Sequence, residues 1–231
     1  MPKAPSTAFT DAAATWNGRF AGDDYLFGTE PNTWLQAHAG VWPPGGRVLC
    51  VADGEGRNSV WLARQGFVVD AFDIAEAGVA KARRLAQQQG VAVNYAVADC
   101  DHYAWPLGAC DGVAAIFIQF ADPAQRERLF ARMAASLNPG GTLIRKPTRC
   151  ALRYSRLGRP GALMLQGYTP KQLEYRTGGP PYASHLYTPA MLREAFAELQ
   201  IVELREYEAD VAEGSGHCGR SALIGLVARR R

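Results

Sequence analysis

Acidic residues and glycines recur at the ends of apolar runs in the first half of this 231-residue sequence. The run 47–52 ends in the sequence Asp-Gly-Glu-Gly at 53–56, where the two glycines let the backbone pass close to a ligand. Asp73 ends the next run, where a carboxylate can accept hydrogen bonds from both hydroxyls of a ribose. Asp99 ends the third run, at a place suited to the amino group of an adenine. Together these residues predict a nucleoside site.

The glycine-rich turn distinguishes between two classes of adenosine-containing cofactor. A dinucleotide site favours a third glycine three residues after Gly56, and Ser59 stands at that position. Glu55 in the turn serves a pyrophosphate poorly, whereas a carboxylate suits the cationic sulfonium and amino-acid part of S-adenosylmethionine. We therefore expect S-adenosylmethionine as the cofactor.

Strand-like and helix-like segments alternate along the chain around these residues. Apolar runs predict strands at 47–52, 67–72, 91–97, 110–117, 142–144, 201–211 and 221–228. Helices are expected at 58–65, 76–89, 123–137 and 189–199. This alternation is typical of an α/β protein with a parallel sheet and right-handed crossovers. The short Gly-rich loop 213–219 predicts that the last two strands form an antiparallel hairpin.

Length and composition limit the class of protein. The sequence is long enough for one large domain, and 48% apolar with 20% charged residues excludes a disordered or fibrous chain. No apolar run reaches the roughly 18 residues of a membrane span, and the first fifteen residues lack the apolar core of a secretory signal. Five widely spaced cysteines favour a reducing compartment. We expect a single domain, 1–231, that is cytoplasmic, has no membrane partner and holds no metal.

The net charge of +3 comes from one segment. Residues 145–164 contain six Lys and Arg residues and no acid, and outside them 19 basic residues face 22 acidic ones. A nucleic-acid-binding function would therefore depend on this block alone. A nucleic-acid partner is not expected, and the block is expected to be an exposed insertion.

The sequence at 48–63 resembles the first motif of class I methyltransferases of the tellurite-resistance type, which reads V-L-D-x-G-C-G-x-G-R-N. Asp73, Asp99-Cys100, residues 117–120 and residues 139–141 fall where that family has its later cofactor motifs. The resemblance implies a Rossmann-like fold with a mostly parallel seven-stranded sheet, helices on both faces and a C-terminal antiparallel hairpin. It also implies methyl transfer from S-adenosylmethionine, with residues 1–35 as an N-terminal lid.

Two residues depart from the family motif. Cys50 occupies the position of an acid, and Ala52 replaces the first glycine. Asp53 or Glu55 would supply the missing carboxylate, and the sequence leaves open which of them contacts the amino group of the cofactor.

The resemblance and the strand ends together give a set of expected site residues. Cofactor-binding residues are expected to be Arg19, Tyr25, Asp53, Gly54, Glu55, Gly56, Asn58, Asp73, Ile74, Asp99, Cys100 and Gln119. In the resembling family, His and Arg of the last hairpin face the methyl acceptor. His217 and Arg220 are therefore expected there, with His185 as a third catalytic residue.

The expected reaction needs little side-chain chemistry, because a sulfonium is already a good leaving group and positioning supplies the rate. No Asn/Asp-Pro-Pro-Tyr sequence follows the fourth strand, which argues against methylation of amino groups. We predict a monomer or homodimer that methylates a small molecule, namely a thiol, a selenol or a chalcogen oxyanion. Two alternatives remain: an RNA methyltransferase using residues 145–164, and a non-catalytic S-adenosylmethionine-binding protein.

Overall fold

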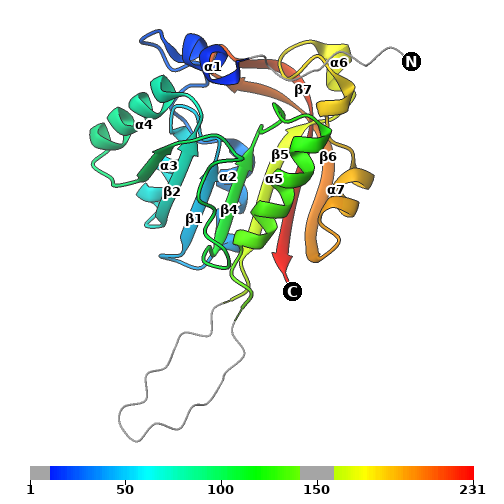
Figure 1. Ribbon diagram of the computed structural model, residues 1–231. Helices are drawn as coiled ribbons and strands as arrows, with labels where there is room; N and C mark the ends of the chain where they lie inside the picture. Colours follow the sequence, from blue (N-terminus) through cyan, green and yellow to red (C-terminus); the bar gives the residue numbers. More distant parts are fainter. Residues whose placement is uncertain (1–10, 141–158) are drawn as a thin grey trace, which may run out of the picture.

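A seven-stranded sheet forms the centre of the computed structural model, which describes residues 11–140 and 159–231 (Figure 1). Its strand order is β3-β2-β1-β4-β5-β7-β6. The strands are β1 (Arg47–Val51), β2 (Val68–Asp73), β3 (Asn94–Val97), β4 (Gly112–Ile116), β5 (Ala162–Tyr168), β6 (Leu199–Glu213) and β7 (His217–Arg230). Strands β1 to β5 are parallel, and β7 runs antiparallel to both β5 and β6. The predicted α/β fold and its terminal hairpin are confirmed.

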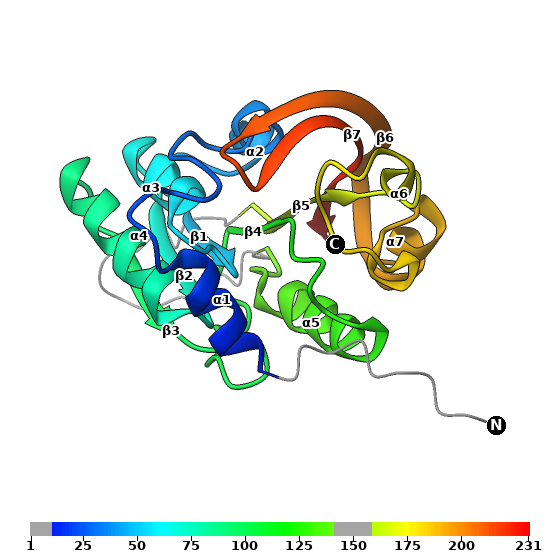
Figure 2. The same cartoon turned by 90° about the horizontal axis from the view of Figure 1, so that it is seen from above.

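Helices pack on both faces of this sheet (Figure 2). They are α1 (Ala12–Phe20), α2 (Thr33–His38), α3 (Arg57–Arg64), α4 (Glu76–Gln88), α5 (Pro123–Ser136), α6 (Gln172–Tyr175) and α7 (Pro189–Ala195), with short 3₁₀ turns at Ala39–Val41 and Ala183–His185. The expected cap of α5 is present, since the Gln125 backbone N–H donates to the Asp122 side chain over 2.8 Å. In the described part of the chain, no helix is both long and apolar enough to span a membrane.

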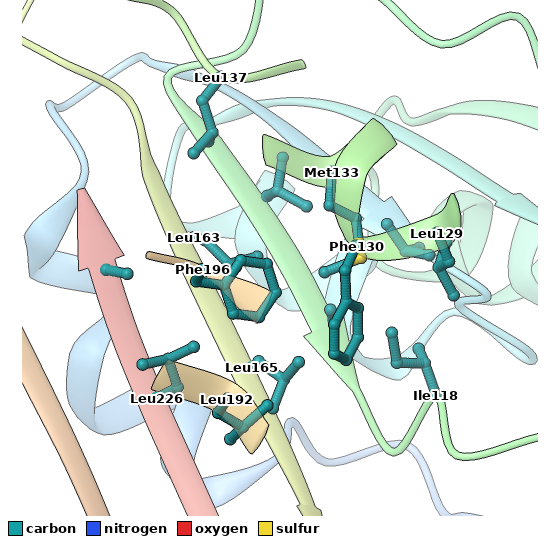
Figure 3. Close-up of a cluster of buried hydrophobic side chains, with 14 of the residues drawn as sticks. Ile118, Leu129, Phe130, Met133, Leu137, Leu163, Leu165, Leu192, Phe196 and Leu226 are labelled. Carbon is teal, nitrogen blue, oxygen red and sulfur yellow. The ribbon is translucent and has the colours of Figure 1, made fainter. Parts of the chain in front are cut away.

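The two faces of the sheet are filled by alternate residues of the same strands. In β1, Leu49 and Val51 pack in the core cluster that contains α5 and α7, whereas Val48 and Cys50 pack in the cluster that contains α2 and α3. Figure 3 shows the first cluster, in which strand residues such as Leu163 meet side chains of both helices. Because both faces are buried, these strands read in the sequence as continuous apolar runs.

The position of the fifth strand corrects the expected boundary of the basic insertion. Strand β5 begins at Ala162, which pairs with Gly112 of β4 and Arg229 of β7. Leu163 and Met164 follow it in the sheet and are fully buried. Residues 162–164 therefore belong to the core rather than to an exposed insertion. The strand expected at 142–144 and the block up to residue 158 lie outside the described residues.

Candidate active site

A cavity of about 250 Å³ opens beyond the carboxyl ends of the parallel strands. The turns after β1, β2 and β3 and the residue after β4 form its floor, and α1 with Phe27 covers it. Open α/β sheets bind ligands at this edge. Of the expected cofactor residues, those lining the cavity are Asp53, Gly54, Asn58, Asp73, Ile74, Asp99 and Cys100.

Asp73 is anchored at the end of β2 by the turns around it. Its Oδ2 accepts a hydrogen bond from the Gly54 backbone N–H over 2.9 Å, and its Oδ1 accepts one from the Ala75 N–H over 2.8 Å. Burial raises the pKa of Asp73, and these two backbone N–H groups oppose that rise. An ionised carboxylate offers about four acceptor sites, so Asp73 keeps acceptor capacity for a ligand.

Glu55 does not line the cavity and instead holds the segment that covers it. Its Oε1 lies 2.7 Å from the Lys81 ammonium nitrogen, and both side chains are buried. The same ammonium donates to the Asp24 carbonyl oxygen over 2.6 Å, and Tyr25 donates its hydroxyl to the Lys81 carbonyl oxygen. Of the two carboxylates that the sequence left open, only Asp53 lines the cavity among the described residues.

Gly56 serves helix packing rather than close approach to a ligand. It has φ +91°, and a Cβ there would lie 2.6 Å from the Ala82 Cβ of α4. The residue does not line the cavity. The second glycine of the turn thus brings α3 against α4, which the motif alone did not distinguish from ligand contact.

Ala52 occupies the left-handed region of backbone space with φ +49°, where the resembling motif has glycine. A Cβ in that region costs about 1–2 kcal/mol, part of which the larger entropy of an unfolded glycine offsets. We expect Ala52→Gly to raise the free energy of unfolding by about 0.5–1 kcal/mol, measured by urea denaturation. Ala63→Gly, inside helix α3, is the control and should lower it by about 1 kcal/mol. Destabilisation by Ala52→Gly would contradict the expected strain.

Asp53 is the other carboxylate of the turn, and it is partly exposed where it lines the cavity. Its Oδ2 accepts a hydrogen bond from the Ser59 hydroxyl, whose oxygen lies 2.8 Å from the Tyr95 hydroxyl oxygen. Burial raises the pKa of Asp53 from 3.8 to about 7, even though the Ser59 hydrogen bond lowers it. The Asp53 carboxyl is therefore about half ionised at neutral pH. A cationic ligand beside it would favour the ionised form.

The titration of Asp53 gives a stability prediction with a defined sign. Because the folded-state pKa is higher than the unfolded one, Asp53 stabilises the fold most below pH 3.8 and less as pH rises to about 7. Asp53→Asn keeps the shape and removes the charge, so it should stabilise the cofactor-free protein at pH 8 by at least about 1 kcal/mol. Melting temperatures at pH 4 supply the control, since the two proteins should agree there. A variant less stable at pH 8 would contradict the assignment.

A second cavity of about 700 Å³ adjoins the first. The two share five lining residues, which we call the aperture: Trp16, Phe27, Phe117, Phe120 and His217. Arg19 and Gln119, expected to bind the cofactor, line this second cavity instead, as does His185. The volume lies within the range of small-molecule sites.

His217 is the polar member of the aperture. Its ring centroid lies 4.5 Å from that of Phe27 and 4.4 Å from that of Phe117, and the residue is 8% exposed. Its Nδ1 lies 3.7 Å from Glu213 Oε2, too far for a hydrogen bond but close enough for charge attraction. Burial lowers the pKa of His217, which keeps the imidazole neutral at pH 7 and able to accept a proton.

Arg57 is a site residue that the sequence analysis missed. It is buried at the start of α3, lines the first cavity, and places its Nη2 2.6 Å from Glu213 Oε2. Its Nη1 is buried and has no hydrogen-bond partner among the described residues. An unpaired guanidinium N–H suits a carboxylate, which S-adenosylmethionine carries, so the cavity fits that cofactor. The signal in the sequence was an arginine directly after the second glycine of the turn.

The remaining expected catalytic residues differ in their placement. Arg220 is exposed and pairs with Glu208 at 2.9 Å, outside both cavities. His185 is buried, and burial lowers its pKa, so it too is neutral. The structure brings His185 and His217 to one cavity and leaves Arg220 away from it.

Comparison with known proteins gives the enzyme class and the fold. Residues 48–141 match the family described as "Methyltransferase domain". A structure reported for the conversion of a disulfide bond into a thioacetal group during echinomycin biosynthesis is similar at TM-score 0.68 and 15% identity, covering 95% of this chain and 92% of that one. TehB from Haemophilus influenzae is similar at TM-score 0.64 and 14% identity, covering 95% and 67%. No curated protein sequence matches the chain.

A third similar structure contains S-adenosylhomocysteine, the demethylated form of the expected cofactor. Magnesium protoporphyrin IX methyltransferase from Synechocystis with bound S-adenosylhomocysteine has TM-score 0.57 and 18% identity, covering 95% of this chain and 83% of that one. At such identities the structures define the fold, and the matched domain defines the enzyme class. The chain is therefore an S-adenosylmethionine-dependent methyltransferase with the Rossmann-like class I fold.

Proposed function

We propose that this enzyme methylates a small organic thiol or selenol in the second cavity, with S-adenosylmethionine in the first. The observation that carries the proposal is the aperture, where a neutral His217 stands between the two cavities. A soft nucleophile of low pKa needs only a modest base and correct alignment.

Different residues of the first cavity are assigned to different parts of the cofactor. Arg57 Nη1 would pair with the carboxylate, Asp53 would face the cationic end, and Asp73 would accept hydrogen bonds from the ribose. Asp99 is assigned to the adenine. Although partial burial raises its pKa, hydrogen bonds from His102 and Asp101 hold the pKa of Asp99 below its usual value, so it is ionised. The bound cofactor supplies an electrophilic methyl group on a sulfonium.

His217 moves the one proton of the reaction. His217 would take the proton of the acceptor sulfur as that sulfur bonds to the methyl carbon, and the electron pair of the broken carbon–sulfur bond would stay with S-adenosylhomocysteine. The resulting imidazolium lies beside the Glu213 carboxylate. Burial raises the pKa of Glu213, but the nearby His217 ring and the hydrogen-bonded Arg57 guanidinium lower it to about 2, so it stays ionised.

The charges of the second cavity favour a thiol or selenol over a chalcogen oxyanion. Among its described lining residues Arg19 is the one cation and Asp11 the one carboxylate. The Arg19 guanidinium lies 4.4 Å from the centroid of the Trp16 ring and is stacked on it. A small oxyanion would need several converging cations or N–H groups to offset its lost hydration.

A thiol acceptor also agrees with the chemistry reported for one of the similar structures. The reported conversion of a disulfide into a thioacetal is sulfur chemistry in that protein. Likeness to TehB supports assignment to the tellurite-resistance type, which we propose as the subfamily.

Label transfer tests the function. The enzyme is incubated with S-adenosylmethionine carrying a trideuterated methyl group and separately with thiols, selenols, selenite, tellurite and tRNA. Mass spectrometry should find a trideuteromethyl thioether or selenoether as the main product. Labelled tRNA would favour the RNA alternative, and cofactor binding without any product across the panel would favour the non-catalytic one.

A further inference from the structure

We infer that the second cavity takes a flat aromatic or heteroaromatic ring as the body of the acceptor. The inference rests on the proposed function, since it names the class of molecule that presents the nucleophile to His217. The inference is based on the residues that line this cavity. Six of them are aromatic and two are prolines: Trp16, Phe27, Phe117, Phe120, Tyr168, Tyr182, Pro180 and Pro181.

Four of these rings form a continuous series around His217. The Trp16 and Phe27 centroids are 6.5 Å apart, and those of Phe117 and Tyr168 are 4.8 Å apart. His217 lies within 4.5 Å of both Phe27 and Phe117 and so joins the two pairs. Rings at these spacings offer both faces and edges to a further ring, whereas an aliphatic group would gain burial alone.

The segment 179–181 forms a further part of the cavity wall, next to Tyr168. Gly179 has φ +84°, and a Cβ there would lie 2.7 Å from the Tyr168 ring, so the backbone lies directly on that ring. Pro180 and Pro181 follow with fixed φ angles and no rotatable side chain. Because Gly179, Pro180 and Pro181 have no rotatable side chains, this part of the wall is preformed and leaves the cavity open for a ligand.

The polar groups of the cavity suit an uncharged acceptor. Burial lowers the pKa of both His185 and His217, so each imidazole is neutral at pH 7. The Tyr168 hydroxyl is buried and has no hydrogen-bond partner among the described residues. These groups can orient ring nitrogens or hydroxyls by hydrogen bonds without requiring a charge on the acceptor.

A pair of methyl thioethers tests the inference by binding rather than by turnover. Thioanisole and cyclohexyl methyl sulfide carry the same sulfur on six-carbon rings that differ in planarity. Neither has a thiol, so differences in thiol pKa do not enter. With S-adenosylhomocysteine present, calorimetry should show thioanisole binding about tenfold tighter, the gain expected from one or two aromatic contacts. Equal affinity, or preference for the cyclohexyl compound, would overturn the inference.

Tyr182→Leu ties that preference to the cavity wall. Tyr182 is 48% exposed and lines the second cavity but not the first. Its replacement should therefore leave folding and S-adenosylhomocysteine affinity unchanged. We expect the preference for thioanisole to fall about threefold. Tyr175→Leu, a partly exposed tyrosine outside both cavities, is the matched control and should keep it. Equal losses in both variants, or no loss in Tyr182→Leu, would count against the assigned wall.

The two proposals fail in different ways. Tight binding of thioanisole without label transfer to any thiol would retain the aromatic site and reject the thiol as nucleophile. Label transfer to aliphatic and aromatic thiols alike, with equal binding of the two thioethers, would retain the proposed function and reject the aromatic acceptor.

Discussion

His217→Ala should lower kcat for methyl transfer to a thiol about 100-fold, while the dissociation constant of S-adenosylmethionine changes by less than about threefold. General bases contribute rate factors of about 10²–10⁴, and a thiol of low pKa lies at the lower end of that range. Steady-state kinetics and calorimetry on the same preparations give the two values.

Arg220→Ala provides the matched control from the same hairpin. Arg220 is exposed and paired with Glu208, away from both cavities, so this variant should keep its kcat within about twofold. An equal loss of kcat in both variants would indicate that the hairpin acts as a structural unit. Loss of cofactor affinity in His217→Ala would assign the imidazole to the first cavity instead.

The pH dependence distinguishes a base from a merely structural histidine. Because burial lowers the pKa of His217 from 6.5, the base is available at neutral pH and is lost only in more acidic solution. For an acceptor that is already ionised throughout, kcat/KM should not depend on His217. For a thiol of high pKa, kcat/KM of the wild type should fall in acidic solution, at a pH below the ordinary histidine value of 6.5, and this acidic limb should vanish in His217→Ala. An unchanged profile in the variant would contradict the role.

Asp73→Ala should weaken S-adenosylmethionine binding by about 10- to 100-fold. A pair of charge-assisted hydrogen bonds to ribose hydroxyls contributes about 1.5–3 kcal/mol, which corresponds to that range. The same carboxylate receives the Gly54 and Ala75 N–H groups, so the variant also loosens the turn that forms the cavity floor. Calorimetric titration measures the affinity.

A ligand without the 2′ and 3′ hydroxyls separates the two contributions of Asp73, which are hydrogen bonding to the ribose and support of the turn. Adenosine and 2′,3′-dideoxyadenosine differ only in the ribose hydroxyls. Wild-type protein should prefer adenosine, and Asp73→Ala should lose that preference while binding both ligands weakly. A retained preference would mean that the carboxylate serves the turn alone, and unchanged S-adenosylmethionine affinity would reject the assignment outright.

The strand ends carried the predictable part of the site. Residues 48–51 and 69–72 are buried, so the apolar runs that contain them located β1 and β2 and hence Asp53 and Asp73 at the edge of the sheet. Parallel strands must bring their carboxyl ends to the same side. That constraint alone placed residues 46 positions apart in sequence, Asp53 and Asp99, around one cavity.

Roles that depend on tertiary pairing could not be predicted in this way. Glu55 does not line the cavity, because its carboxylate pairs with the buried ammonium group of Lys81 on α4. Arg57 lines the cavity, because its Nη2 donates a hydrogen bond to Glu213, which lies 156 residues later in the sequence. The end of the expected insertion 145–164 was placed too late, because only pairing with β4 and β7 puts residues 162–164 in strand β5.

A crystal structure with S-adenosylhomocysteine and the S-methyl product of the best thiol tests the central claim most directly. The account predicts one ligand in each cavity, with the two sulfur atoms facing each other across the aperture beside His217 and the cofactor carboxylate on Arg57. A thioether bound away from the second cavity, or S-adenosylhomocysteine outside the cavity lined by Asp53 and Asp73, would contradict it.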